Sequence, residues 1–170
     1  MSEALIAARC SFPVVELTPI AARGGESVEE MVSGPFNNHP DITSAHFPRC
    51  VASSATGGEV RLLLVKPVDD RGRAAPDEVL QRLDEAGFVP EELASLALLK
   101  AHADALWNAG IYYILALGPH SVWEGPDGRY AVYFIANPAD RGFSLYWLEG
   151  DIGGHMWLLV RRRELPTAGT

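Results

Sequence analysis

Residues 111–163 read IYYILALGPHSVWEGPDGRYAVYFIANPADRGFSLYWLEGDIGGHMWLLVRRR, and this stretch decides the fold class. Short runs of apolar and aromatic residues alternate with turn residues, such as Gly118-Pro119 and Gly125-Pro126-Asp127-Gly128. This alternation is typical of consecutive β-strands joined by tight turns, which favour an antiparallel meander. We therefore expect strands at 111–117, 121–124, 129–137, 143–148 and 156–163.

The strand expected at 129–137 is apolar on both of its faces. Side chains alternate along a strand, so Tyr130 and Phe134 share one face while Tyr133 and Ile135 share the other. Both faces of the sheet must therefore be covered by something apolar.

Two helices are expected before these strands. Pro76 and Pro90 favour first helical positions, and Gly87 and Gly110 favour helix ends. An apolar run at 59–66 predicts a further, central strand. The sequence thus predicts an α+β fold, with an antiparallel or mixed sheet of about five or six strands and both main helices on one face.

The length of 170 residues predicts one main domain. We place this α+β domain at 59–163. A loop-rich N-terminal segment, 1–58, is expected to pack on it, and residues 164–170 are expected to form a disordered tail. The part from 34 to 58 is rich in Gly, Pro, Asn, Ser and Thr, and so long a loop is either functional or partly disordered.

Composition narrows the function classes. The net charge of −8 argues against broad nucleic-acid binding, because only Arg161–Arg163 form a basic run. Cys10 and Cys50 are too few for a disulfide framework. No secretory leader pattern is present, and no apolar run approaches the ~20 residues of a membrane span. We expect a cytoplasmic protein with no membrane and no nucleic-acid partner.

One polar cluster offers candidate metal ligands. His39, Asp41, His46 and Cys50 carry the imidazole, carboxylate and thiolate groups that bind zinc. A zinc signature has two pairs of short spacings, whereas these four residues form one irregular set. A surface loop with incidental histidines explains them as well, so we assign neither a metal nor a cofactor.

A second candidate is the glycine-rich turn that contains Asp151 and His155. The carboxylate and imidazole could perform acid–base chemistry, and the glycines would let a ligand approach the backbone. A hairpin turn that needs glycine explains the same residues, and the spacing matches no phosphate-binding fingerprint.

Aromatic side chains on the expected sheet form the third candidate. Such rings can stack on a flat ligand or line an interface, although core packing explains most of them. Together with Asp151 and His155, the candidate ligand or interface residues are Trp123, Tyr133, Tyr146, Trp147 and Trp157.

Part of the chain resembles the closing segment of a group of small bacterial proteins whose function is not known. The resemblance covers about residues 90–163, and the first half of the chain departs from the group. It implies a helix that leads into an ALG-SVW strand and a closing apolar strand, and it supplies no functional residue. The matching residues are Ala116-Leu117-Gly118, Ser121-Val122-Trp123, Gly128-Arg129-Tyr130, Arg141, Leu145, Trp147 and Trp157 through Arg162.

Two hypotheses for function follow. The first is a non-enzymatic cytoplasmic domain that binds a protein or a small molecule and self-associates as a homo-oligomer, such as a homodimer, through its second apolar sheet face. The alternative is a small metal-dependent or hydrolase-like enzyme that uses the His39–Cys50 loop and the Asp151–His155 turn. The alternative requires these two segments to meet in one cleft.

Overall fold

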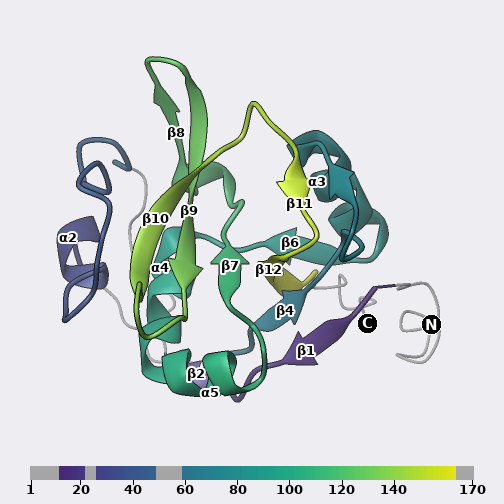
Figure 1. Ribbon diagram of the computed structural model, residues 1–170, viewed down its shortest axis with the longest axis horizontal. Coiled ribbons are helices and arrows are strands. Elements are labelled where there is room, and N and C mark those ends of the chain that lie inside the picture. Colours follow the sequence, from purple (N-terminus) through teal and green to yellow (C-terminus); the bar gives the residue numbers. More distant parts are fainter. Residues whose placement is uncertain (1–11, 22–25, 49–58, 164–170) are drawn as a thin grey trace, which may run out of the picture.

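The computed structural model describes residues 12–21, 26–48 and 59–163 (Figure 1). The strands of the main sheet are β1 (Val14–Glu16), β4 (Leu63–Val65), β6 (Phe88–Pro90), β7 (Tyr113–Leu115), β8 (Val122–Gly125), β9 (Gly128–Ile135), β10 (Gly142–Trp147) and β12 (Met156–Arg162). Two further pairs join β2 (Ile20–Ala21) to β3 (Glu59–Val60) and β5 (Arg73–Ala74) to β11 (Ile152–Gly153).

The helical elements are α2 (Val28–Met31), α3 (Pro76–Glu85), α4 (Leu93–Ala97), the 3-10 turn η1 (Leu98–His102), α5 (Ala103–Asn108) and the 3-10 turn η2 (Pro119–Ser121). The helix predicted at 90–110 is thus three consecutive pieces that begin at Leu93, and Pro90 belongs to β6. Within the described ranges, none of the helices combines the length and the apolar character that crossing a bilayer requires.

The prediction of an α+β fold is confirmed, but the sheet is mixed and has eight strands. Its order is β1-β4-β12-β7-β9-β10, with β6 beside β12 and β8 beside β9. The β8–β9–β10 meander matches the expectation from the turns. β12 instead enters the middle of the sheet, parallel to β7. Leu158, Leu159 and Val160 are all fully buried, and an apolar run of this kind suits a central strand.

The two predicted helices lie on opposite faces of the sheet, so their placement on one face was wrong. Leu83 of α3 belongs to the same buried cluster as Leu63, whereas Leu96 of α4 belongs to the cluster of Leu64. Neighbouring residues of β4 point to opposite faces, which separates the two clusters. Hydrophobic periodicity shows that a helix has an apolar stripe but not which sheet face it meets. The chain therefore covers both faces itself, and homo-oligomer formation stays a prediction.

The outer edge of β10 is covered by the segment that precedes the 39–48 loop. The N–H of Asn37 donates to the carbonyl of Arg141 at 2.8 Å, and the N–H of His39 donates to the carbonyl of Phe143 at 2.9 Å. Gly142 permits this approach, because a Cβ there would lie 2.5 Å from the Asn37 oxygen. An edge strand left bare would expose unpaired backbone groups, so this contact fixes where the loop begins.

The side chain of Asn38 strengthens the same contact. Its Oδ1 accepts a hydrogen bond of 3.0 Å from the Phe143 N–H, and its Nδ2 donates a bond of 2.6 Å to the carbonyl of Val32. One amide therefore joins the end of α2 to the edge of the sheet.

Replacing Asn38 with alanine is expected to lower the free energy of unfolding by about 1–3 kcal/mol, because two buried or half-buried backbone groups lose their partner. Urea unfolding measures the change. Asn137→Ala is the matched control, since the one hydrogen bond of the Asn137 side chain to the described residues comes from the exposed N–H of Ala139. Equal losses in the two variants would contradict the bridging role of Asn38.

Candidate functional site

A shallow hollow of about 140 Å³ lies between the 39–48 loop and the β8–β9 hairpin. We call it the hairpin hollow. Its walls come from the loop, from the hairpin and from β10, which are far apart in the sequence. The lining residues are His39, Asp41, Trp123, Pro126, Asp127, Tyr130 and Leu145.

Three aromatic side chains stand in a row across the strands beside the hollow. Tyr130 of β9 is paired with Trp123 of β8 on one side and with Trp147 of β10 on the other, so all three share one sheet face. The Trp123 and Tyr130 rings lie 5.5 Å apart. The Trp147 side chain is 49% exposed, and its Nε1 donates to the carbonyl of Asp127 at 3.2 Å.

The turn between β8 and β9 requires glycine where Trp147 meets it. Gly128 has a φ of +141°, a conformation that other residues rarely adopt. A Cβ at this position would lie 2.5 Å from Glu149 Cγ and 2.7 Å from Trp147 Nε1. Gly128 thus lets the Trp147 ring close over the hairpin turn.

The 39–48 loop is held by apolar anchors and by a ring stack. Ile42 and Phe47 are buried in the core beneath it. The His46 ring stacks on Trp123, with centroids 4.0 Å apart and planes 14° apart. His46 Nδ1 also lies 2.8 Å from the carbonyl oxygen of Asp41. Sequence reasoning proposed His46 as a metal ligand, and the structure uses it to position Trp123.

A carboxylate on α2 fixes the middle of the loop. The N–H of Ser44 donates to Glu29 at 2.8 Å, and the Ser44 hydroxyl donates to the same carboxylate. These bonds to the charged form lower the pKa of Glu29. The loop is therefore fastened at its start, middle and end.

Two carboxylates give the hollow its polar character. The Tyr130 hydroxyl donates to Asp127 Oδ1 at 2.7 Å. This bond, with burial and the negative charges of Asp127 and Asp41, raises the pKa of Tyr130. His39 Nδ1 accepts from the Asp41 N–H at 3.1 Å. The same nitrogen lies 3.9 Å from Asp41 Oδ2. The described residues of the lining include no Lys or Arg.

Other predicted site residues lie on the opposite face of the sheet. Tyr133 and Tyr146 form an edge-to-face pair at 5.9 Å, and the Tyr146 hydroxyl donates to the carbonyl of Asp151 at 3.0 Å. The His155 ring meets Tyr113 edge-on at 5.5 Å. Tyr113, Tyr133 and Tyr146 all pack against the core under α3. The described parts of the two segments that the enzyme hypothesis joins thus meet different faces.

Two predicted residues remain. Trp157 lies beside Lys66, whose Nζ is 5.7 Å from the ring centroid. Cys50 lies outside the described residues. Among the residues that the structure does describe, no three His, Cys, Asp or Glu side chains are grouped so that they could hold a metal ion.

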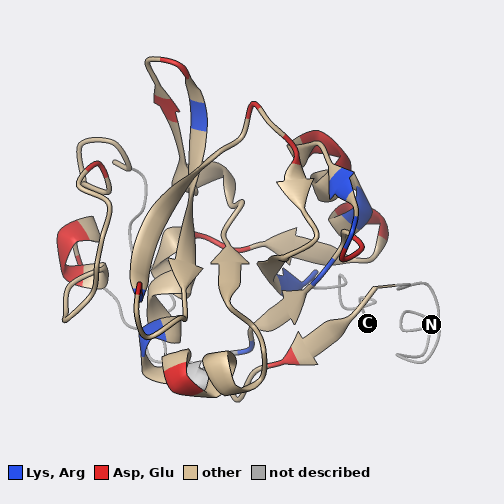
Figure 2. Cartoon of the chain, in the orientation of Figure 1, with Lys and Arg blue, Asp and Glu red and all other residues tan. Residues whose placement is uncertain are grey.

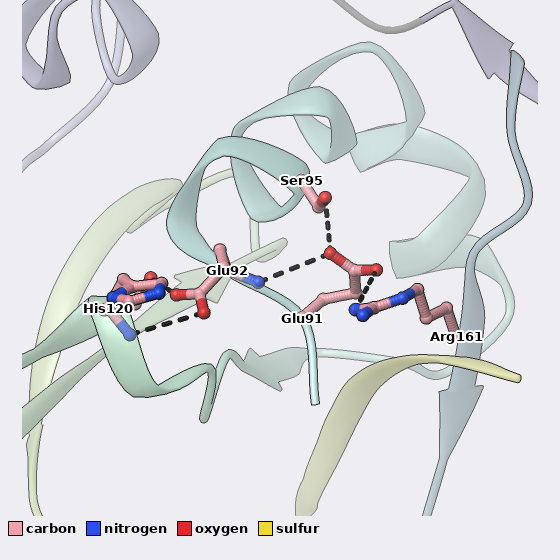
Figure 3. Close-up of polar contacts among 6 residues, drawn as sticks. Glu91, Glu92, Ser95, His120 and Arg161 are labelled. Carbon is pink, nitrogen blue, oxygen red and sulfur yellow. Dashed lines mark hydrogen bonds and ion pairs between the residues drawn. The ribbon is translucent and has the colours of Figure 1, made fainter. Parts of the chain in front are cut away.

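A separate polar cluster surrounds the start of α4. Glu91 is 6% exposed, and its Oε2 accepts from the Ser95 hydroxyl at 2.7 Å. Its Oε1 pairs with Arg161 at 3.3 Å. Figure 3 shows the neighbouring Glu92 carboxylate pointing the opposite way, toward His120.

Glu92 joins the same helix start to η2. Its carboxylate accepts from the Ser121 hydroxyl at 2.5 Å and from the His120 N–H at 3.3 Å. The Ser121 oxygen in turn accepts from the N–H of Leu93 at 2.7 Å, and so caps α4 from another element. Because Glu91 and Glu92 face apart and each is bonded, the cluster is a structural clamp between β6, α4, η2 and β12.

The basic run at 161–163 takes part in this cluster and in a neighbouring ion pair. Arg161 pairs with Glu91, and Arg163 pairs with Asp84. Two of the three charges in this run are therefore engaged with carboxylates.

The Glu91→Gln variant is expected to lower the free energy of unfolding by about 1.5–3 kcal/mol, since it removes a charge from a buried hydrogen-bonded pair. Denaturant unfolding measures the loss. Glu85→Gln, on the exposed side of α3, is the control, and it is expected to change the free energy of unfolding by no more than about 0.5 kcal/mol. A neutral result for Glu91→Gln would show that the clamp does not support the fold.

Comparisons of the chain with protein-family models, with curated proteins and with solved structures return no match. The resemblance of residues 90–163 to a group of bacterial proteins is not tested by this result. The function is therefore inferred from the geometry of the described residues.

The sequence predicted part of the hairpin hollow. His39, Asp41, His46 and Trp123 were each singled out, but from separate arguments. Asp127 was missed, because a Pro-Asp-Gly turn explains an aspartate without any ligand. Its position three residues before Tyr130 was the available signal, since a tight hairpin turn brings the two side chains together.

The raised pKa of Tyr130 leads to a prediction for pH dependence. Folding favours the protonated phenol, so this contribution to stability is complete below the unfolded pKa of about 10 and is lost as the pH rises through the higher folded value. In Asp127→Asn we expect Tyr130 to ionise at a lower pH than in the unaltered protein.

Phenolate absorbance measures this ionisation, with Tyr130→Phe subtracted to isolate the one tyrosine. Asp140→Asn is the control, because it removes one surface charge from another turn. Identical ionisation midpoints of Tyr130 in the unaltered protein and in Asp127→Asn would contradict the assignment of the raised pKa to Asp127.

Proposed function

We propose that the chain is a non-enzymatic binding domain and that the hairpin hollow holds part of its ligand. Support comes from one observation: aromatic and polar side chains from residues 39–41, 123–130 and 145 converge on one hollow. Binding sites typically combine apolar and aromatic walls with a few placed polar groups. A hollow of about 140 Å³ suits a side chain or a small headgroup rather than a large molecule.

The site is also held in shape before any ligand arrives. His46 stacks on Trp123, and Asp127 accepts from the Tyr130 hydroxyl. Groups that are already ordered lose less conformational entropy on binding, which favours affinity. This order supports binding as the role of these aromatics, beyond packing the core.

The enzyme hypothesis has less support. Among the residues that the structure describes, the lining holds two carboxylates and one imidazole, but no Ser, Thr, Cys or Lys that could act as a nucleophile. His155 and Asp151, which this hypothesis also needs, contact the other sheet face. Acid–base chemistry by His39 and Asp41 is the form of the hypothesis that the hollow would permit.

Self-association and a cytoplasmic location stay predictions. The sequence argument for a homo-oligomer relied on a sheet face that only a second copy could cover, and α3 with its neighbours covers that face. Light scattering on the purified chain measures its mass in solution directly.

We expect at least one probe among choline, glucose, inorganic phosphate and benzyl alcohol to shift the indole N–H signal of Trp123 in a saturable way. Nuclear magnetic resonance of the isotope-labelled protein measures the shift, and Trp107, which packs on Tyr112 instead, serves as the internal reference. A panel in which no probe shifts Trp123 saturably would overturn the hollow as a ligand site.

A blocking variant provides the matched control. Leu145→Phe places a larger side chain in the hollow and is expected to abolish the shift. Leu80→Phe, at another half-buried leucine on α3, is expected to leave it intact.

A further inference from the structure

The charges around the hairpin hollow distinguish between classes of ligand. Asp41 and Asp127 line it, whereas no Lys or Arg is found among the described residues of the lining. Figure 2 shows both acidic and basic residues on the β8–β9 hairpin, with an acidic residue at its tip. Among the described residues of the lining, a ligand that carries negative charge would meet two carboxylates and no compensating cation.

The nearest basic side chain of the hairpin does not offset these charges. Arg129 is paired across the strands with Glu124, so it lies on the face opposite Tyr130. Its Nε also donates to Glu149 at 3.1 Å. That bond and the charge of Glu149 raise the pKa of Arg129. A hydrogen bond from the Arg129 backbone N–H, together with the Nε bond and the Arg129 charge, lowers the pKa of Glu149. The pair is therefore satisfied within itself and faces away from the hollow.

The Asp41 carboxylate can accept further hydrogen bonds. The His39 Nδ1 atom lies 3.9 Å from the Asp41 Oδ2 atom, and the Asp41 side chain is 49% exposed. Asp127 uses Oδ1 for the Tyr130 hydroxyl, and each ionised carboxylate oxygen can accept more than one bond. Both carboxylates can thus meet a ligand.

Aromatic rings favour the same kind of ligand as the carboxylates. The electron-rich faces of Trp and Tyr attract cations, and the attraction is strongest for weakly hydrated ones. Trp123 and Tyr130 line the hollow, and the half-exposed Trp147 stands beside it. The raised pKa of Tyr130 is consistent with a negative potential at this point.

We infer that the hairpin hollow binds a ligand through an alkylammonium group, with Trp123 and Tyr130 contacting its carbon atoms and Asp41 and Asp127 neutralising its charge. This inference rests on the proposed binding function and narrows its ligand to a cation. The site holds the group without forming or breaking a covalent bond.

Choline and its uncharged isostere, in which carbon replaces the quaternary nitrogen, test the inference. The two have nearly the same shape, so only the charge differs. We expect choline to bind about tenfold tighter than the isostere, measured as saturation of the Trp123 indole shift. Equal affinity of the two probes would overturn the inference.

Isosteric variants test which residues supply the preference. Asp41→Asn and Asp127→Asn are each expected to weaken choline binding several-fold while changing the affinity of the isostere little. Asp140→Asn removes a charge elsewhere and is expected to bind choline as before. Unchanged choline affinity in both the Asp41 and the Asp127 variant would contradict the assignment of these two carboxylates.

A second arm separates two kinds of alkylammonium. n-Butylammonium carries the primary ammonium of a lysine side chain, whereas choline carries a methylated one. Tighter binding of either identifies the form that the hollow takes, and binding of neither overturns the inference. If glucose or benzyl alcohol then still shifts Trp123 saturably, the binding function stands and only the cationic ligand class falls.

Discussion

The candidate site depends on the pairing of residues 37–39 with the outer edge of β10. Backbone N–H groups of Asn37 and His39 donate to that strand, and the Asn38 side chain ties the same strand to the end of α2. The pairing satisfies an edge that would otherwise be open to other chains. It also fixes Asp41, two residues later, above the hairpin. A contact that protects the sheet thus positions one wall of the hollow.

Strand alternation then sorts the aromatic residues into two groups with different roles. Trp123, Tyr130 and Trp147 share the face that meets the 39–48 loop, while Tyr133 and Tyr146 share the face under α3. A shift of register by one residue would exchange the two groups. The Gly128 turn disfavours this shift, because it would place a side chain where the φ of +141° and the close approach of Trp147 favour glycine.

Local patterns in the sequence were enough to predict the α+β class, the β8–β10 meander and the start of α3 at Pro76. They were not enough to place β12 between β4 and β7, since a parallel pairing between distant strands has no local signal. They also could not assign α3 and α4 to opposite faces. For the same reason the sequence marked His39, Asp41 and Trp123 as candidates but did not predict that they lie in one site. Their proximity depends on the β10 edge contact, which no short stretch of sequence encodes. Asn38, the residue that makes this contact, looks like ordinary loop composition.

The net charge of the chain also affects which ligands approach the hairpin hollow. The value of −8 counts against phosphate-rich partners, and it also draws cations toward the molecule. Salt screens this long-range attraction within about 8 Å at physiological ionic strength, so it cannot select a binding position by itself. Selection needs carboxylates at contact distance that are not neutralised by a neighbour. Among the described residues no Lys or Arg pairs with Asp41 or Asp127, whereas Glu149 pairs with Arg129 on the far side of the hairpin. The alternation of a single strand, with Arg129 on one face and Tyr130 on the other, therefore keeps the hollow negative.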